Sequence, residues 1–150
     1  MIYDKKQALH SIQQLLKLQS LGVLATQGKK YPYSTLVGFA ASDDLKTLFF
    51  ATIRDTRKYQ NIQMHSQVSM LIDSRSNQVK DFKDAQALTV LGSARDEEGS
   101  FLRKNEALYL QKHPYLREFL KDPNCAFMRL DVHKYIIVNR FQEVIEIELS

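Results

Sequence analysis

The sequence predicts a single α+β domain that is mainly β: an antiparallel barrel with helices at its periphery. A chain of 150 residues with 44% hydrophobic content can bury one core and leaves no room for a second. Several short segments alternate apolar and polar residues with a period of two, which is typical of half-buried strands. Turn residues separate these segments, and no repeat or linker marks a boundary. Residues 1–150 are therefore expected to form one domain.

Residues from about 5 to 19 form the first predicted element, an amphipathic helix capped by Asp4. Its apolar stripe consists of Leu9, Ile12, Leu16 and Gln19, widened by Leu15. This helix is the main feature of residues 1–20, and we expect it to pack on the barrel or on a partner subunit.

A predicted pair of strands follows, at 21–27 and 33–42, joined by the turn Gly28-Lys29-Lys30. The second strand is apolar or small on both faces, which suits barrel core on one side and a covered surface on the other. One face carries Tyr33, Thr35, Val37, Phe39 and Ala41, and the other carries Ser34, Leu36, Gly38 and Ala40. Gly38 would let another backbone or a flat ligand approach closely.

Residues 48–73, LFFATIRDTRKYQNIQMHSQVSMLID, contain the most informative pattern. A β-type run ends at Ile53, a short helix is expected after Thr56, and Val68, Met70 and Ile72 return to strand spacing. Thr56 is a good N-cap because its side-chain oxygen can accept from the free amides of the first turn.

Arg57 and Lys58 break the local rules, because cations in a first helical turn oppose the helix dipole at about 0.3–1 kcal/mol each. An anion held by the helix amides and both cations would make them favourable. This interpretation predicts a phosphate site. The alternative is a solvated basic turn near Asp55, and the residues alone leave both open.

The second half of the chain continues with strands and short helices. Residues 73–84 are expected to be a loop or a loop with one helical turn around Phe82, and residues 86–96 a strand. Residues 97–121 are predicted to be helical in two pieces separated at Pro114, with Phe101 and Leu108 on the apolar face.

Two strands, at about 125–138 and 143–149, are predicted to finish the chain around a turn at 139–142. Phe127, Arg129, Asp131 and His133 share one strand face, a polar row expected to face solvent or a subunit interface. Cys125 is expected to be a small core residue.

Composition and motif searches exclude several classes of function. The net charge is +4, but basic residues are scattered, which argues against nucleic-acid binding. No apolar run reaches membrane-span length, and a single cysteine suits a reducing compartment, so the cytoplasm is expected. The sequence has no P-loop, dinucleotide fingerprint, zinc-protease motif or nucleophile elbow, and the histidines are isolated. No metal site is predicted, and the catalytic residues stay unknown.

The pieces FFAT, TRK and QVSMLID, in this order and spacing, resemble the pattern of the FMN-binding split-barrel family, which includes pyridoxamine 5′-phosphate oxidase-like flavoproteins. The resemblance covers most of the chain from Leu21 to Leu149. It implies an antiparallel split β-barrel of six or seven strands that binds FMN and acts as an oxidoreductase on an unidentified small molecule. It also implies a homodimer with two cofactor sites at the interface, each drawing on both chains.

The resemblance also assigns residues to the FMN site. It implies that Arg57 and Lys58 bind the phosphate, and that Thr52 and Thr56 bind its oxygens or the ribityl chain. The isoalloxazine would contact the main chain of Ser34, Thr35, Leu36 and Val37. The oxidases carry an Arg and a Lys on this strand, where the present chain has Tyr33-Ser34 and Val37-Gly38. Phosphate binding would therefore depend more heavily on Arg57 and Lys58.

Other departures limit what the resemblance implies about substrate. Ala87 stands where the oxidases place a flavin-contacting Gln, and Tyr109, Arg103 and Arg117 do not match the spacing of their substrate residues. Two alternatives to an enzyme follow: a flavin carrier or sensor without turnover, and a haem-binding relative that uses His133 or His113. The lack of an evident acid or base is consistent with flavin chemistry, in which the cofactor supplies the redox centre.

Overall fold

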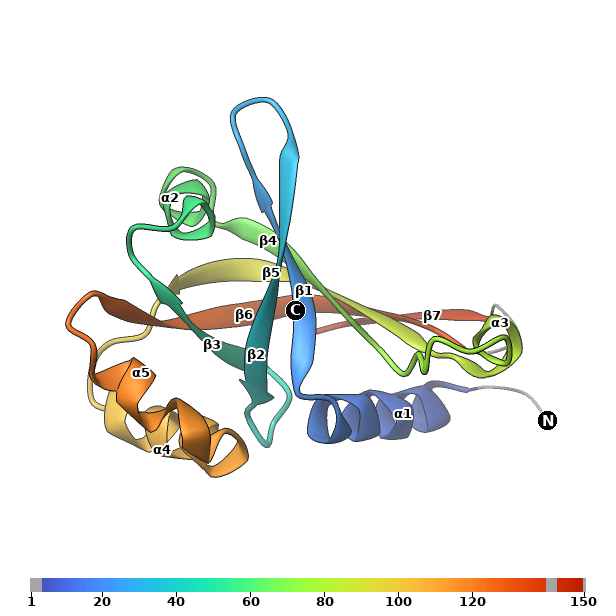
Figure 1. The fold of residues 1–150 in the computed structure, drawn as a ribbon. Coiled ribbons are helices and arrows are strands. Elements are labelled where there is room, and N and C mark those ends of the chain that lie inside the picture. Colours follow the sequence, from blue (N-terminus) through green and yellow to red (C-terminus); the bar gives the residue numbers. More distant parts are fainter. Residues whose placement is uncertain (1–3, 140–142, 150) are drawn as a thin grey trace.

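The computed structural model describes residues 4–139 and 143–149, and within them seven strands form one antiparallel sheet (Figure 1). The strand order is β3-β2-β1-β4-β5-β6-β7, and an additional β3–β6 pairing closes the first six strands of the chain into a barrel. The strands are β1 Leu21–Gln27, β2 Pro32–Ala41, β3 Thr47–Ile53, β4 Gln67–Asp73, β5 Ala87–Asp96, β6 Cys125–Val138 and β7 Val144–Glu148. The predicted split-barrel α+β fold is confirmed.

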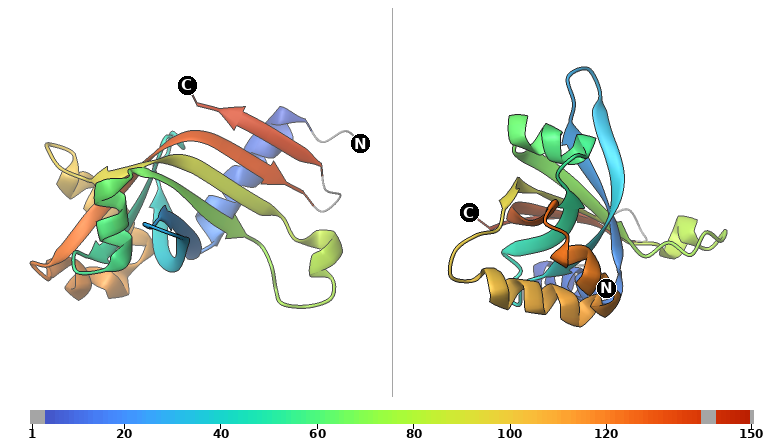
Figure 2. Two further views of the ribbon diagram at one scale, coloured as in Figure 1. Left: turned by 90° about the horizontal axis from the view of Figure 1, so that it is seen from above. Right: turned by 60° about the vertical axis from the view of Figure 1, so that its left-hand side comes forward.

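The long strand β6 joins the barrel to its extension. Its first half pairs with β3, from Cys125 to Asp131, and its second half pairs with β7, from Lys134 to Val138. From Met128 to Val138 the strand pairs with β5 along its other edge, with a register shift at Leu91/Gly92. A Cβ at Gly92 would collide with the carbonyl of Asp131, so only glycine fits this irregularity. Figure 2 shows β7 on the outer edge of β6.

Helices close or cover the barrel at several places. They are α1 Lys5–Leu18, α2 Arg57–Met64, α3 Asp81–Asp84, α4 Leu102–Lys112, the 3-10 turn η1 Pro114–Leu116 and α5 Arg117–Lys121. α1 begins at the predicted cap, where the Asp4 side chain accepts from the Gln7 amide and the Gln7 side chain accepts from the Asp4 amide. The buried face of α1 joins the main core through Ala8, Ile12, Leu15 and Leu16. This face of α1 therefore packs on the barrel core.

A second, smaller core lies outside the barrel, where α4 and α5 cover β3 and β6. Tyr109 is almost fully buried there and packs edge-on against Phe127, whose ring stacks on Phe49 at 5.6 Å between ring centres. The prediction that Phe101 belongs to the apolar face was wrong, because α4 begins one residue later and leaves Phe101 exposed at its N-cap.

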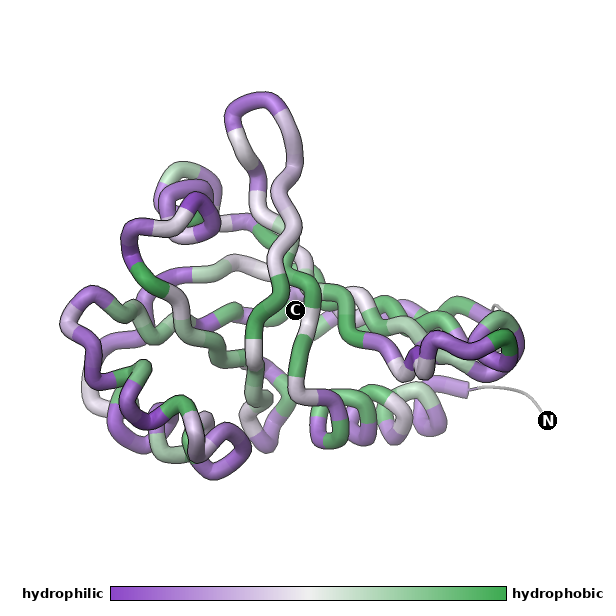
Figure 3. The backbone as a smooth tube through the Cα atoms, in the orientation of Figure 1, coloured by the Kyte–Doolittle hydropathy of each residue, from purple (hydrophilic) through white to green (hydrophobic). Residues whose placement is uncertain are grey.

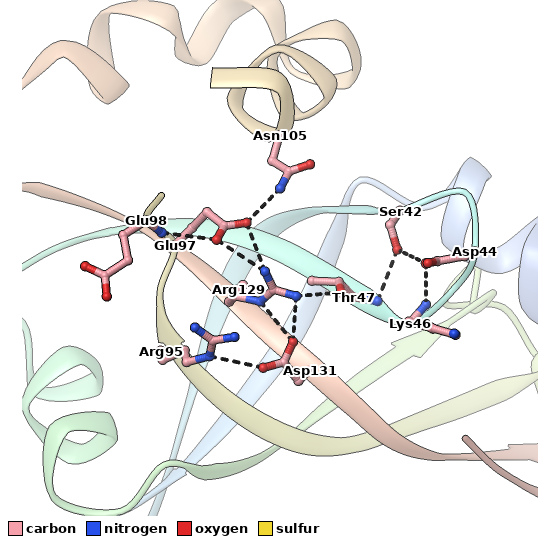
Figure 4. A network of polar contacts seen from close by, with 10 residues as sticks. All are labelled: Ser42, Asp44, Lys46, Thr47, Arg95, Glu97, Glu98, Asn105, Arg129 and Asp131. Atoms are coloured by element: carbon pink, nitrogen blue, oxygen red, sulfur yellow. Dashed lines mark hydrogen bonds and ion pairs between the residues drawn. The ribbon is translucent and has the colours of Figure 1, made fainter. Parts of the chain in front are cut away.

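The polar row on β6 is an outward face that is only partly open to solvent. Arg129 lies between Glu97, Asp131 and Thr47, with guanidinium distances of 3.2, 2.8 and 3.2 Å (Figure 4). Glu97 is buried and also accepts from Asn105 of α4 at 2.7 Å. Burial works against the charge of Arg129, but the contacts with Asp131 and Glu97 raise its pKa above the ordinary value. The network therefore ties α4 to the barrel wall.

Two further expectations are refined by the structure. The polar stretch after β4 contains a single helical turn, α3, whose Asp81 carboxylate accepts from the amides of Ser76, Asn77 and Gln78. Cys125 is only half-buried at the start of β6, so it is not a core residue. Burial raises the pKa of its thiol, which disfavours the reactive thiolate.

Candidate functional site

The candidate site lies where β2 and β3 separate. These strands pair only from Phe39 to Ala41 on β2, although β2 pairs with β1 from Pro32 to Gly38 and β3 pairs with β6 up to Ile53. Since Phe39 pairs with Phe50, a continued ladder would place Val37 opposite Thr52, but no pair forms there. The edge of β2 that faces β3 is consequently free of a strand partner along this stretch. Its main-chain groups are available to a ligand.

Three predicted residues converge at the β3 side of this opening. Thr56 caps α2: its hydroxyl accepts from the Tyr59 amide at 3.3 Å and donates to the Ile53 carbonyl at 2.8 Å. The Thr52 hydroxyl lies 3.1 Å from that of Thr56, and the Lys58 ammonium donates to Thr52 at 2.9 Å. The Thr52 hydroxyl thus contacts both the Thr56 hydroxyl and the Lys58 ammonium at the helix start.

The Lys58 ammonium is held by the Thr52 hydroxyl rather than by a carboxylate. Its ammonium is partly buried, and this burial lowers its pKa below the ordinary value. No carboxylate within the described ranges 4–139 and 143–149 forms an ion pair with it. A partly desolvated ammonium next to a hydroxyl and a helix N-terminus is electrostatically suited to an anion.

Arg57, the neighbour of Lys58 in the first turn of α2, contacts β2 rather than β3. Its guanidinium sits over the ring of Tyr33, at the start of β2, at 5.2 Å from the ring centre. This stacking bridges α2 to β2 across the separated strands. This ring contact uses none of the guanidinium N–H groups as hydrogen-bond donors, so they can still donate to a phosphate oxygen.

The two charged residues that precede this helix, Arg54 and Asp55, bind partners other than Arg57 and Lys58. Asp55 accepts from the side-chain amide of Asn124 at 2.7 Å. Arg54 forms an ion pair with Asp96 at 2.7 Å and also donates to Tyr59, which donates to Asp96. Asp55 therefore forms no ion pair with Arg57 or Lys58 among the described residues.

The β2 side of the opening carries the other expected residues. Val37 is 5% exposed in the main core, whereas Ser34 and Leu36 point outward and are exposed. Thr35 faces inward with Val37, and its hydroxyl is buried without a hydrogen-bond partner among the residues that the structure describes. An orphaned buried hydroxyl costs about 1–3 kcal/mol, so a polar ligand group here would relieve it.

The structure thus groups the predicted residues around one opening but divides them into two walls. Thr52, Thr56 and Lys58 form one wall, and the β2 strand with Arg57 over Tyr33 forms the other. An anion at the helix start and a flat group along the β2 edge match these donors. The residues present therefore fit a phosphorylated ring compound of the flavin type.

Sequence reasoning missed two contributors. Tyr33 serves as the platform for Arg57, and the Arg54–Tyr59–Asp96 cluster fixes the first turns of α2 against the end of β5. In the sequence, the only sign of the Tyr33–Arg57 contact is an aromatic residue at a strand start with no predicted core role. The contact between Arg54 and Asp96 has no local sequence pattern, because the two residues are 42 positions apart.

Two other expectations about this region change. The space beside Gly38 is already filled: the Tyr109 hydroxyl donates to its carbonyl at 3.1 Å, and a Cβ there would contact Tyr109 and His113. The expectation of a ligand approach at Gly38 was wrong.

His113 is buried, and its ring nitrogens contact the Phe39 carbonyl and the Tyr115 hydroxyl at 2.7 and 3.2 Å. His133 is exposed on β6 beside Ser93.

Comparisons with known proteins place the chain in context. The sequence profile of the pyridoxamine 5′-phosphate oxidase family matches residues 8–139. No curated protein matches the chain significantly. Within the described parts of the chain, no helix is long and apolar enough to cross a membrane, and no group of metal-ligating side chains is found.

Solved structures share the fold at low sequence identity. A heme binding protein from Mycobacterium smegmatis aligns with TM-score 0.78 and 16% identity, over 87% of this chain and 53% of that one. ChuZ of Campylobacter jejuni aligns with TM-score 0.83 and 11% identity, over 97% and 61%. A FAD-binding protein from Mesorhizobium loti aligns with TM-score 0.68 and 14% identity, over 86% and 90%. At these identities the likeness supports the fold alone.

Proposed function

This chain belongs to the pyridoxamine 5′-phosphate oxidase family, and from that premise we propose that it binds FMN and acts as an oxidoreductase on a small molecule. The observation that carries the proposal is Lys58, a partly buried ammonium held against Thr52 at the N-terminus of α2, with no counter-ion among the described residues. Burying a charge without a partner is costly, so the site is preorganised for an anionic group.

The residues of the opening have distinct roles in this proposal. Lys58 and Arg57 would bind the phosphate from the two walls, and Thr52 would bind a phosphate oxygen or the ribityl chain. Thr56 chiefly fixes the helix start, because its hydroxyl already has three contacts. The unpaired edge of β2 between Ser34 and Val37 would hold the ring through main-chain groups. A bound flavin would supply the redox chemistry, and the protein would supply position and electrostatics.

A homodimer is part of the proposal. The outer face of β1, β2 and β4 is apolar: Leu21, Leu36 and Leu71 are 56%, 65% and 38% exposed. Leu36 and Leu71 both pair with Val23, so they flank it on one sheet face. A contiguous exposed apolar face of this kind marks an interaction surface. A second copy over this face would also cover the outer side of Ser34 and Leu36, close to the proposed ring position.

Two alternatives stay in view, a flavin carrier or sensor without turnover and a haem-binding relative. The structural likeness to a heme binding protein motivates the second. His113 is a poor candidate for an axial ligand of haem iron, because both of its ring nitrogens already have partners. The single cysteine, Cys125, supports a reducing compartment such as the cytoplasm.

A visible absorption spectrum of the purified protein, with and without added FMN, separates these functions. We expect flavin bands that stay with the protein through gel filtration. A Soret band instead would favour the haem alternative and refute the proposal. Oxidation of a reduced nicotinamide by the flavin-loaded protein would then distinguish an enzyme from a carrier.

A further inference from the structure

A cavity that shares no lining residue with the proposed flavin site lies between the last turns of α1 and α4 and the turn that joins β2 to β3. Its volume is about 510 Å³, within the range of about 300–1,000 Å³ that is usual for small-molecule sites. Figure 1 shows this turn between the two helices, and Figure 3 shows hydrophobic residues at the adjoining end of β2. Five aliphatic side chains line this helix-end cavity: Leu16, Ala40, Ala41, Leu45 and Leu108.

Lys112, at the end of α4, lies half-buried in the wall of the helix-end cavity. Its ammonium donates to the carbonyl of Leu16, another lining residue, at 2.8 Å, and lies over the Phe39 ring at 3.9 Å from the ring centre. No ion pair within residues 4–139 and 143–149 includes Lys112. The fold therefore fixes this nitrogen beside the cavity without a carboxylate that would keep it charged.

The position of Lys112 makes its neutral amine accessible near physiological pH. Burial lowers the pKa of Lys112 to about 8. At pH 7.5 about a quarter of this side chain is then the neutral amine, against about one part in a thousand for an ordinary lysine. A lysine that is desolvated in an apolar site is a nucleophile toward carbonyl carbon.

The charged groups around Lys112 favour a neutral ligand over an ion. The last turns of α1 and α4 are the negative ends of two helix dipoles, and Asp43 brings a carboxylate to the lining, so an anion would be repelled. Lys17 adds a positive charge in the last turn of α1, which together with Lys112 would repel a cation. His113, the next residue after Lys112, has its ring against the Phe39 carbonyl.

The lining matches a small aliphatic carbonyl compound. Its hydrocarbon part would contact the five aliphatic side chains, and Gln13 and Gln111 bring side-chain amides to the cavity that can hydrogen-bond an oxygen. We propose that the helix-end cavity is a second small-molecule site, in which Lys112 binds a neutral aliphatic aldehyde or ketone as a reversible imine.

Imine formation is balanced without an oxidant or a reductant. The neutral nitrogen of Lys112 attacks the carbonyl carbon, a carbon–nitrogen bond forms, and the carbon–oxygen bond breaks. The two hydrogens of the amine leave with the oxygen as water. This step uses neither Lys58 nor a flavin, so the inference is independent of the proposed function.

The test is incubation of the protein with hexanal at pH 7.5, followed by reduction with sodium borohydride and peptide mapping by mass spectrometry. Reduction makes the linkage permanent, so the map identifies the modified lysines. Lys112 should be modified about 10-fold faster than the exposed lysines, because its larger neutral fraction outweighs the lower nucleophilicity of a less basic amine. Hexanol, which has the same chain without a carbonyl, should slow the reaction of Lys112 alone. Glyoxylate, an aldehyde that carries a carboxylate, should show no such preference for Lys112.

Two variants control for the assignment. Lys112→Arg keeps a cation that can donate to the Leu16 carbonyl but forms no imine under these conditions, so the fast phase of total labelling should be lost. Lys104→Met removes an exposed lysine of α4 that does not line the cavity, and the fast phase should be retained. Circular dichroism establishes that both variants are folded.

Modification of Lys112 at the rate of the exposed lysines would overturn the inference and leave Lys112 as a cap of the last turn of α1. A rate that hexanol does not change would overturn it too, because the amine would then react without use of the cavity. A preference of Lys112 for glyoxylate would contradict a neutral ligand. Failure of the protein to bind FMN would refute the proposed function and leave this inference standing, since the two sites share no residue.

Discussion

Replacing Lys58 with Met is the sharpest single test of the anion site. Methionine keeps most of the aliphatic volume and removes the ammonium, which lies 2.9 Å from Thr52 and forms no ion pair with the described residues. A charge-assisted contact with phosphate is worth about 1.5–3 kcal/mol, so FMN should bind about 10- to 150-fold more weakly.

The ligand comparison isolates the phosphate. Riboflavin has the same ring and ribityl chain but no phosphate, so its affinity should change by less than about twofold in Lys58→Met. Fluorescence titration with both ligands measures this, and Lys5→Met, at an exposed position on α1, is the control. An equal loss of FMN and riboflavin affinity would mean that Lys58 supports the ring or the fold, and the phosphate assignment would be refuted.

In the absence of FMN, the same substitution should leave the stability of the protein unchanged or raise it slightly. Because burial disfavours the ammonium of Lys58, removing its charge relieves a desolvation cost. We therefore expect Lys58→Met to unfold at the same or a slightly higher urea concentration than the unmodified protein. A clear loss of stability would show that the ammonium contributes to the fold.

Three further predictions concern other elements. Thr56→Ala removes the N-cap of α2 and should lower the free energy of unfolding by about 0.5–2 kcal/mol in urea titrations, whereas Thr56→Ser should largely retain it. Burial lowers the pKa of Lys112 to about 8, below its value in the unfolded chain. Between these two pKa values the unfolded chain binds more protons than the folded one, so the free energy of unfolding should rise with pH. This rise should be smaller in Lys112→Met, in urea titrations at pH 7.5 and 9.5, and identical pH dependence would contradict it. Leu36→Asp should convert the proposed dimer to monomer in light scattering, and an unchanged mass would exclude that face as the interface.

The strand content and the α2 region were predictable because their signals are local. Apolar alternation, or a continuous apolar run in the case of β3, located the strands, and Asp4 and Thr56 cap their helices as their sequence contexts indicate. Arg57 and Lys58 are a local signal as well, because two cations in a first helical turn are unfavourable unless an anion compensates them. Local patterns were sufficient wherever one side chain and its near neighbours decide the outcome.

The rest depended on how distant segments meet. The orphaned hydroxyl of Thr35 follows from the separation of β2 and β3, which no residue near Thr35 encodes. The burial of Tyr109 follows from Phe127 and the Gly38 carbonyl, both far away in sequence. Asp96 could be assigned to Arg54 only once β5 and α2 were in place.

Equilibrium titration of the purified protein with FMN, beside the double variant Arg57→Ala/Lys58→Ala, tests the central claim most directly. The unmodified protein should bind FMN, and the folded double variant should lose affinity by about two to four orders of magnitude, the sum of two charge-assisted contacts. Circular dichroism establishes that the variant is folded. Undiminished FMN binding by the folded double variant would contradict the account.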